Sequence, residues 1–253
     1  QQMLVMARSS QFAPTELAKA MKTLALAGLD AKQVYSAVRD VVNFAIAGDT
    51  TIEKAADVMT TVATAFSIAA ENYAYVGDTI SVAAAESKSS VESMGEAFKT
   101  ASVINSQYGV TLEDTAIGLS LLANAGTQGT SAGTALKNMY ADLAGRTPKV
   151  EKALKDLGVN AIDPLTGKMR VQKDVFVDLM RALAERTPEA QSKYLRVIFS
   201  ERGEKEAMQI LKNLRKALAT YAALSGIAMI CVLDFAARHA CFRFHAVDGQ
   251  RLL

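Results

Sequence analysis

The chain has 253 residues, of which 50% are hydrophobic and 21% charged, and this supply of apolar side chains excludes an intrinsically disordered protein. Aromatic residues make up only 6% and Trp is absent, so a core must be built from Ala, Leu, Val, Ile and Met, which favours closely packed helices over a β-sandwich. The 28 basic and 26 acidic side chains are mixed along the chain and leave a net charge of +2, which argues against specific nucleic acid binding as a main task.

Residues 1–13 show no clear periodicity and are predicted to form an N-terminal extension. The chain starts at Gln1 rather than at Met, and it lacks the basic region, apolar run and cleavage site of a secretory signal. We therefore expect a processed or partial piece of a longer polypeptide. Two cysteines are too few for a disulfide framework, which fits a reducing compartment.

Residues 14–145 are predicted to form a helical core, because apolar residues recur at helical spacing and Ser, Thr or Asp precedes most of these runs. The predicted caps are Asp30 paired with Gln33, Thr50 or Thr51, Ser89 or Ser90, and Thr111 followed by Asp114. The predicted core faces are Leu17, Met21 and Leu24; Val34, Val38, Val41 and Ala45; Ala55, Val58, Val62 and Ala65; and Val91, Met94, Phe98 and Ala101. Gly28, Gly48 and Gly126 are predicted to end helices. The same kind of unit recurs, but its spacing looks too irregular to predict a solenoid.

A glycine-rich corner lies within LSLLANAGTQGTSAGTAL, residues 119–136. Gly126 and Gly129 tolerate positive φ and suit the end of one helix and the turn after it, while Thr130 or Ser131 offers a side-chain oxygen to the next helix. Nothing in this stretch is chemically reactive. Because the backbone of such a corner is accessible, we predict a partner-binding corner at Gly126, Gly129, Ser131 and Gly133.

Residues 146–215 are predicted to form a helical subdomain with a small β-hairpin or extended loop near residues 158–171. In VNAIDPLTGKMRV, the residues Asp163, Pro164 and Gly167 are those that a turn requires, and the alternative is an ion or partner site around Asp163. Helical spacing resumes after this segment, is interrupted at Pro188 and continues to Phe199. The whole pattern predicts an all-α fold, an array of short amphipathic helices.

Residues 216–253 are predicted to be a divergent hydrophobic helix and tail. Residues 217–233 carry no charge and lie between basic residues such as Lys216 and Arg238. This length is at the short limit for a bilayer core, which needs roughly 17 to 25 apolar residues. Two alternatives stay open, a membrane-spanning helix and a buried or self-associating helix. The candidate membrane or assembly positions are Leu218, Tyr221, Leu224, Ile227 and Ile230.

The sequence predicts no catalytic site, no cofactor and no metal site. The residues best suited to a zinc site are Cys231, His239, Cys241 and His245, but they lack the paired short spacings of structural zinc sites. Carboxylate pairs such as Glu113 with Asp114, or Glu204 with Glu206, are better explained as first-turn or solvated residues of helices. The glycines of the corner are not followed by the Lys that a phosphate-binding loop requires.

Seven segments, taken in order, carry a family resemblance. They are ELAKAMKTLALAGLDAKQV, NFAIAGDTTIEKAADVMTTVATAF, SKSSVESMGEAFK, YGVTLEDTAIGLSLLANAG, SAGTAL, ALKDLGVNAIDPLTGKMR and IFSERGEKEAMQIL. One alanine-rich amphipathic segment alone would have little specificity, but the ordered set covers about residues 14–215. This set resembles the core region of tail tape-measure proteins of long-tailed bacteriophages and prophages.

The resemblance implies a non-enzymatic structural protein of a phage tail. It would be the core module of a tape-measure protein that scaffolds tail-tube assembly, sets tail length and takes part in DNA delivery. Implied partners are further copies of the chain in a homo-oligomer, the tail-tube protein, tail assembly chaperones, and tail-tip or baseplate proteins. The implied location is the virion tail, with the host cytoplasm during assembly and the host inner membrane during DNA delivery.

Two other functions stay open from the sequence. The first is a membrane-active helical module, either channel-forming or toxin-like, that uses residues 217–233. The second is a tail-associated peptidoglycan hydrolase, which would need a catalytic group that the residues do not reveal. The chain is also short for a tape-measure protein and lacks long heptad-rich arms, so the resemblance concerns the globular core alone.

Overall fold

The computed structural model describes residues 12–144, 147–163, 165, 170, 172–199 and 203–212. Two compact units are distinguished, residues 1–210 and residues 211–253, and the fold described below is that of the first. Within the described residues the regular elements are helices, which confirms the predicted all-α fold.

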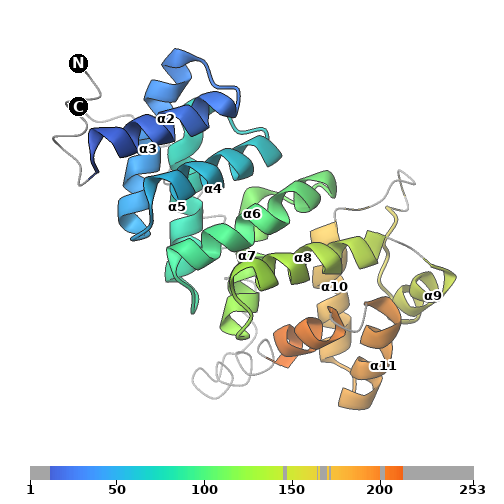
Figure 1. The fold of residues 1–253 in the computed structure, drawn as a ribbon. Helices are drawn as coiled ribbons and strands as arrows, with labels where there is room; N and C mark the ends of the chain where they lie inside the picture. Colours follow the sequence, from blue (N-terminus) through green and yellow to red (C-terminus); the bar gives the residue numbers. More distant parts are fainter. Residues whose placement is uncertain are drawn as a thin grey trace, which may run out of the picture. The chain divides into compact units, whose positions relative to one another are not determined.

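The helices follow one another with short connections (Figure 1). Their bounds are α2 Pro14–Leu26, α3 Ala31–Ala47, α4 Ile52–Ala65, the 3-10 helix η1 Ala70–Asn72, α5 Tyr73–Ala85, α6 Val91–Gln107, α7 Leu112–Asn124, α8 Gly129–Ala144, α9 Pro148–Asp156, α10 Gln172–Ala184 and α11 Pro188–Ile198. Residues 203–212 are helical as well.

The helices α2 to α8 form a two-layered array of helix pairs. Helices α2, α4, α6 and α8 begin at residues 14, 52, 91 and 129, which are 38, 39 and 38 residues apart. Each of them packs on the next, and α3, α5 and α7 pack on one another in the same order, so every second helix lies in the same layer. This is an α-solenoid. We call α2–α3, α4–α5 and α6–α7 its repeats 1, 2 and 3.

A constant spacing of 39 residues relates the buried positions of the three repeats. Buried residues at equivalent positions are Ala20, Met59 and Phe98; Val34, Tyr73 and Leu112; Val41, Ile80 and Leu119; and Ala45, Ala84 and Ala123. The prediction that the spacing is too irregular for a solenoid was therefore wrong. It failed because side-chain size and helix caps vary between repeats, whereas the four sets of positions named above are buried in all three.

Most of the predicted caps are confirmed. The Asp30 carboxylate accepts the Gln33 backbone N–H at 2.9 Å, and the Gln33 side chain accepts the Asp30 N–H at 3.0 Å. Of the paired alternatives, Thr51 and Ser90 cap α4 and α6. Helix α3 ends at Ala47 with Gly48 as its C-cap, as predicted, and the residue that adopts positive φ is the following Asp49. Gly48 is close to Val91, where an added Cβ would lie 3.0 Å from Cγ1.

The end of the array after α8 is covered by the helices that follow. Helix α10 packs on α8, and α9 packs on α11. The Tyr140 ring lies edge-on to Phe176 with centroids 6.2 Å apart, and the Phe176 and Phe199 centroids are 6.4 Å apart. Aromatic residues thus gather where the array stops, as expected of a terminal repeat that cannot pack on a further copy.

The segment predicted as a hairpin or loop is a loop in the part that the structure describes. The Arg170 N–H donates to the Ala161 carbonyl at 3.1 Å, and the Arg170 guanidinium donates to the Asn160 carbonyl and to Asp178. The Asp163 carboxylate accepts the Leu165 N–H at 2.8 Å, as in a turn. This geometry supports the structural explanation of Asp163.

Helix α8 crosses α6 at a glycine. Gly133 is buried, and a Cβ built there would lie 2.3 Å from the Ala97 carbonyl oxygen and 2.7 Å from the Thr100 Cβ. Helices α6 and α8 make the most extensive helix–helix contact of the array. The absence of a side chain at Gly133 is therefore what allows the two backbones to approach.

The core of repeat 3 is more polar than those of repeats 1 and 2. Ser102, Asn105 and Thr115 are fully buried there, whereas Ala63 and Val76 occupy the positions equivalent to Ser102 and Thr115 in repeat 2. The Asn105 side-chain N–H donates to the Thr115 hydroxyl at 3.1 Å, and the Asn105 Oδ1 is buried without a hydrogen-bond partner. A buried polar atom without a partner lowers stability, so repeat 3 has the least favourable core.

We predict that Gly133→Ala lowers stability by about 1–3 kcal/mol, because the added methyl group meets a backbone carbonyl that cannot move aside. The matched control is Gly77→Ala in α5, where the nearest atoms are flexible Met59 and Phe44 side-chain atoms at 3.4–3.5 Å. That control should leave stability unchanged or raise it by up to about 1 kcal/mol. Thermal unfolding followed by circular dichroism measures both, and equal shifts would contradict the close approach.

A second prediction concerns the buried pair in repeat 3. Thr115→Val removes the oxygen that accepts the Asn105 N–H, and we expect it to cost about 1–3 kcal/mol. Combining it with Asn105→Leu removes both polar partners and should restore or exceed the wild-type stability. Urea unfolding of the two single variants and of the double variant tests this non-additivity. A double variant that is as unstable as the sum of the single variants would show that the pair is not the cause.

Candidate functional site

The predicted partner-binding corner joins α7 to α8. The Thr127 N–H donates to the Leu122 carbonyl at 2.9 Å and the Gly126 N–H to the Ala123 carbonyl at 3.0 Å, which is the hydrogen-bond pattern of a Schellman motif. Gly126 has φ +96°, as this motif requires, and is exposed. The sequence prediction for the end of α7 is confirmed.

Polar side chains join this corner to the loop between repeats 2 and 3. The Lys88 N–H donates to the Asn124 side-chain oxygen at 3.2 Å, and the Gln128 side-chain amide donates to the Lys88 carbonyl. Asn124 lies at the end of α7 and Gln128 directly before α8. These two side chains stabilise the packing of neighbouring repeats, which is a structural role.

The four residues proposed for the corner do not share one accessible surface. Gly126 and Ser131 are exposed, Gly129 is half-buried, and Gly133 is buried against α6. Gly133 is therefore removed from the candidate site, because no partner can reach it in the folded array. Helix α8 begins at Gly129, so Thr130 and Ser131 lie within its first turn instead of preceding it. Partner binding at Gly126, Gly129 and Ser131 remains a prediction.

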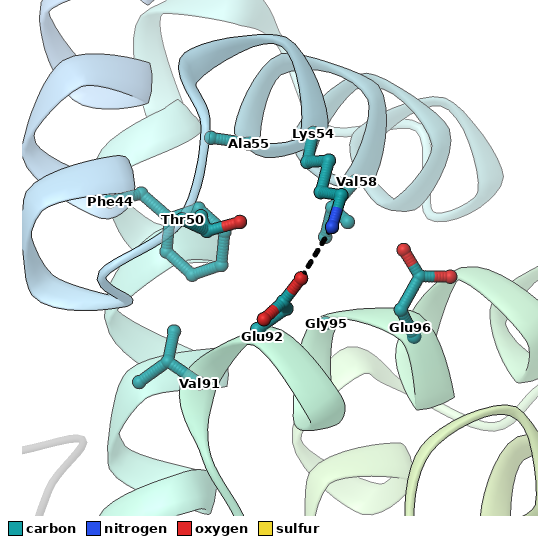
Figure 2. A pocket seen from close by; sticks show the side chains of 9 residues that line it. All are labelled: Phe44, Thr50, Lys54, Ala55, Val58, Val91, Glu92, Gly95 and Glu96. Atoms are coloured by element: carbon teal, nitrogen blue, oxygen red, sulfur yellow. Dashed lines mark hydrogen bonds and ion pairs between the residues drawn. The ribbon is translucent and has the colours of Figure 1, made fainter.

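A small pocket lies where α3, α4 and α6 meet (Figure 2). The Lys54 ammonium and the Glu92 carboxylate form an ion pair of 2.6 Å beside it, and Glu96 lies close by. The Thr50 hydroxyl oxygen is buried without a hydrogen-bond partner and lines the same pocket. The cavity volume of about 10 Å³ corresponds to a single water molecule, which is too small for an organic ligand.

The pKa shifts of three ionisable groups are explained by their structural surroundings. Burial raises the pKa of Asp40, whose carboxylate accepts the Ala74 N–H at 3.1 Å and so joins α3 to the start of α5. Burial also raises the pKa of Tyr140, and hydrogen bonding to Asp57 raises the pKa of Lys99. No cluster of three potential metal ligands occurs among the described residues.

The two carboxylate pairs differ in their surroundings. Glu113 and Asp114 lie in the first turn of α7. Glu204 accepts hydrogen bonds from the Ser192 hydroxyl and the Arg196 guanidinium, both at 3.0 Å. Glu113, Asp114 and Glu204 thus lie at a helix start or in helix contacts, whereas the Glu206 Oε2 atom is buried without a hydrogen-bond partner.

The C-terminal candidates lie outside the described residues. This concerns the membrane or assembly positions Leu218, Tyr221, Leu224, Ile227 and Ile230, and the potential ligands Cys231, His239, Cys241 and His245. In the part of the chain that the structure describes, no helix has both the length and the apolar character needed to cross a bilayer.

The structure also reveals a surface that sequence reasoning missed. Tyr75 and Val82 on α5 are exposed, and Ile117 and Leu121 on α7 are half-buried. A sequence signal for it does exist, since residues 55–87 and 100–136 contain no Lys or Arg. That gap in the basic residues is hidden by the nearly balanced charge of the whole chain.

We predict that Gly126→Val lowers stability by roughly 1–2 kcal/mol, because an L-residue is strained at φ +96°. A Cβ at this position meets no atom within 4 Å, so Gly126→Ala should cost a similar amount. The reverse change is Asp49→Gly, at a residue with φ +47° that ends α3 in the same way, and it should raise the melting temperature. Unchanged melting temperatures in all three variants would contradict the assigned backbone strain.

The comparisons with known proteins identify the family. A family model described as phage-related minor tail protein matches residues 1–200. The chain is 27% identical over 190 residues to the "Tape measure protein" of Pneumococcus phage Dp-1, covering 75% of this chain and 16% of that protein. It is 26% identical over 198 residues to the "Probable tape measure protein" of Escherichia phage P2, covering 78% of this chain and 24% of that protein.

The chain therefore spans a quarter or less of the length of these two relatives. No solved structure matches it. The family match covers most of the chain, including the whole solenoid and helices α9, α10 and α11. The chain belongs to the phage-related minor tail protein family, and within it resembles a segment of tape-measure proteins.

Proposed function

We propose that the chain is a non-enzymatic structural module of a tape-measure protein in the virion tail, where it scaffolds assembly of the tail tube. The observation that carries this proposal is the family match together with two tape-measure relatives. The fold supports it, since an α-solenoid offers long, regular surfaces for protein contacts. Further copies of the chain, the tube protein, assembly chaperones and tail-tip proteins are the proposed partners.

The geometry refines how such a module relates to tail length. Neighbouring packed helices are about 8–10 Å apart, so a repeat of this array advances it by roughly 10 Å. The same 39 residues in one straight α-helix would span about 58 Å. A folded solenoid therefore spans much less length per residue than a straight helix does. We therefore propose that the full-length protein sets tail length through segments other than this array, and that the array is a folded scaffold of fixed size.

We also propose that the protein takes part in DNA delivery. This role depends on residues 217–233, which combine an uncharged run with basic neighbours. A membrane-active module would depend on the same residues. In DNA delivery these residues would act as part of an assembled tail, whereas in a membrane-active module they would act in the isolated chain.

We predict the effect of lengthening the array by a second copy of residues 52–129, inserted in register before Thr130 in the full-length protein. A folded array should lengthen the tail by about 20 Å, whereas a straight helix of the same 78 residues would add about 117 Å. Electron microscopy of purified tails from the encoding phage or prophage measures the difference. The unmodified tail is the control, and a gain of more than about 100 Å would show that the array is straightened in the tail.

A further inference from the structure

Helices α5 and α7 lie side by side on one layer of the solenoid. The Ser120 hydroxyl donates to the Ala83 carbonyl at 3.1 Å, and the Tyr75 hydroxyl donates to the Glu113 carboxylate. Contacts near both ends of the helices show that they run in the same direction in register. The outer sides of the two helices therefore belong to one face of this layer.

Apolar side chains occupy both helices on their solvent-facing side. Tyr75 and Val82 are 44% and 43% exposed on α5. Ile117 and Leu121 are half-buried on α7, and Leu121 is 39 residues after Val82, at the equivalent position of the next repeat. We call these four residues the outer apolar patch. Tyr is frequent at the centre of binding surfaces, because it provides a large contact area at little conformational cost.

The charged side chains on α5 and α7, the two helices that carry the outer apolar patch, are all acidic. Asp78 is exposed on α5 between Tyr75 and Val82, at helical spacing from both, and Glu113 lies at the start of α7. Neither α5 nor α7 contains a Lys or Arg. In repeat 1, Arg39 and Asn43 stand at the positions of Asp78 and Val82, and in repeat 3 Ile117 and Leu121 stand there, so an acidic residue beside an apolar one at these positions occurs in repeat 2 alone.

We propose that the outer apolar patch is a docking site for an amphipathic helix of a partner protein, one whose apolar face is flanked by Lys or Arg. Such a helix would bury Tyr75, Val82 and Leu121 and bring its cations to Asp78. Helices dock in grooves through apolar residues at i, i+3, i+4 and i+7, and opposite charges at the rim select the partner.

The charge of the patch disfavours two other occupants. A second copy related by a two-fold axis would bring the same surface onto itself and place Asp78 of one copy near Asp78 of the other. An anionic membrane surface would likewise repel the carboxylates. A cationic helix is the occupant that gains both apolar burial and ion pairing.

The experiment measures binding of a fluorescently labelled synthetic peptide to the whole chain by anisotropy at low salt. The probe is an 18-residue helical peptide with Leu at i, i+3, i+4 and i+7 and Lys elsewhere, and its comparison peptide has Glu in place of Lys. The test variant is Tyr75→Ser with Val82→Ser. The matched control is Tyr35→Ser with Ile46→Ser on α3, two residues that are each 45% exposed in the same layer of repeat 1.

The proposal expects the Lys peptide to bind wild type and the control variant alike, and at least tenfold more weakly to the test variant. Asp78→Lys should weaken the Lys peptide and strengthen the Glu peptide. Equal loss in test and control variants, or equal binding of both peptides to wild type, would overturn it. Sedimentation measures whether the chain self-associates. Self-association that disappears in the test variant would identify a second copy as the occupant and would also overturn the proposal. Circular dichroism confirms that each variant is folded.

Discussion

The array depends on one constraint, which is that a pair of short helices can bury its apolar face only against the next pair. Ala45, Ala84 and Ala123 show this directly, because the same small residue is buried at the same position of each repeat. A single repeat is too small to enclose a core of its own, so stability comes from the contacts between neighbours. The spacing of 39 residues is the length of chain needed to return to the same layer.

Packing rather than surface charge holds the repeats together. Lys19 with Glu53 and Lys54 with Glu92 join neighbouring repeats, but the side chains of both pairs are more than 40% exposed. Exposed ion pairs contribute about 0–1 kcal/mol, and each helix cap about 1 kcal/mol. A single large buried apolar side chain contributes roughly 1.5–3 kcal/mol, and each repeat buries several. The caps and ion pairs therefore fix where helices begin and how they are oriented, while burial decides that the array forms.

The sequence was sufficient to predict the helices and most of their caps, because these depend on neighbours within one turn. Asp30 with Gln33 is such a local signal, and so is Gly126. The solenoid was missed because its register joins residues of unequal size, such as Leu24 and Ser102, which only tertiary contacts relate. Gly133 was misjudged for a related reason. Glycine serves both tight turns and close helix crossings, and these two uses look alike in a sequence.

The candidate surface was missed for a different physical reason, although two stretches without Lys or Arg mark its place in the sequence. Whether an apolar helical residue is covered depends on which neighbours stack on it, and Val82 and Leu121 have the composition of core residues although they face outward. The repeats share their buried positions but differ on their outer faces, where stacking imposes no requirement. Arg39 in repeat 1 and Asp78 in repeat 2 occupy the same outer position with opposite charge. Differences between repeats on this face are therefore free to serve partner recognition without cost to the fold.

The same energetics bear on the form that the module takes inside a tail. Straightening the array into extended helices would expose the buried side chains of every repeat, such as Met59, Phe98 and Leu119. At roughly 1.5–3 kcal/mol for each large side chain, even a few repeats would cost well over 10 kcal/mol, more than caps and ion pairs return. Only a partner that covers these inner faces over their whole length could offset this cost. Without one, the array keeps its folded size, and it does so because the repeats stabilise each other rather than because any repeat is stable alone.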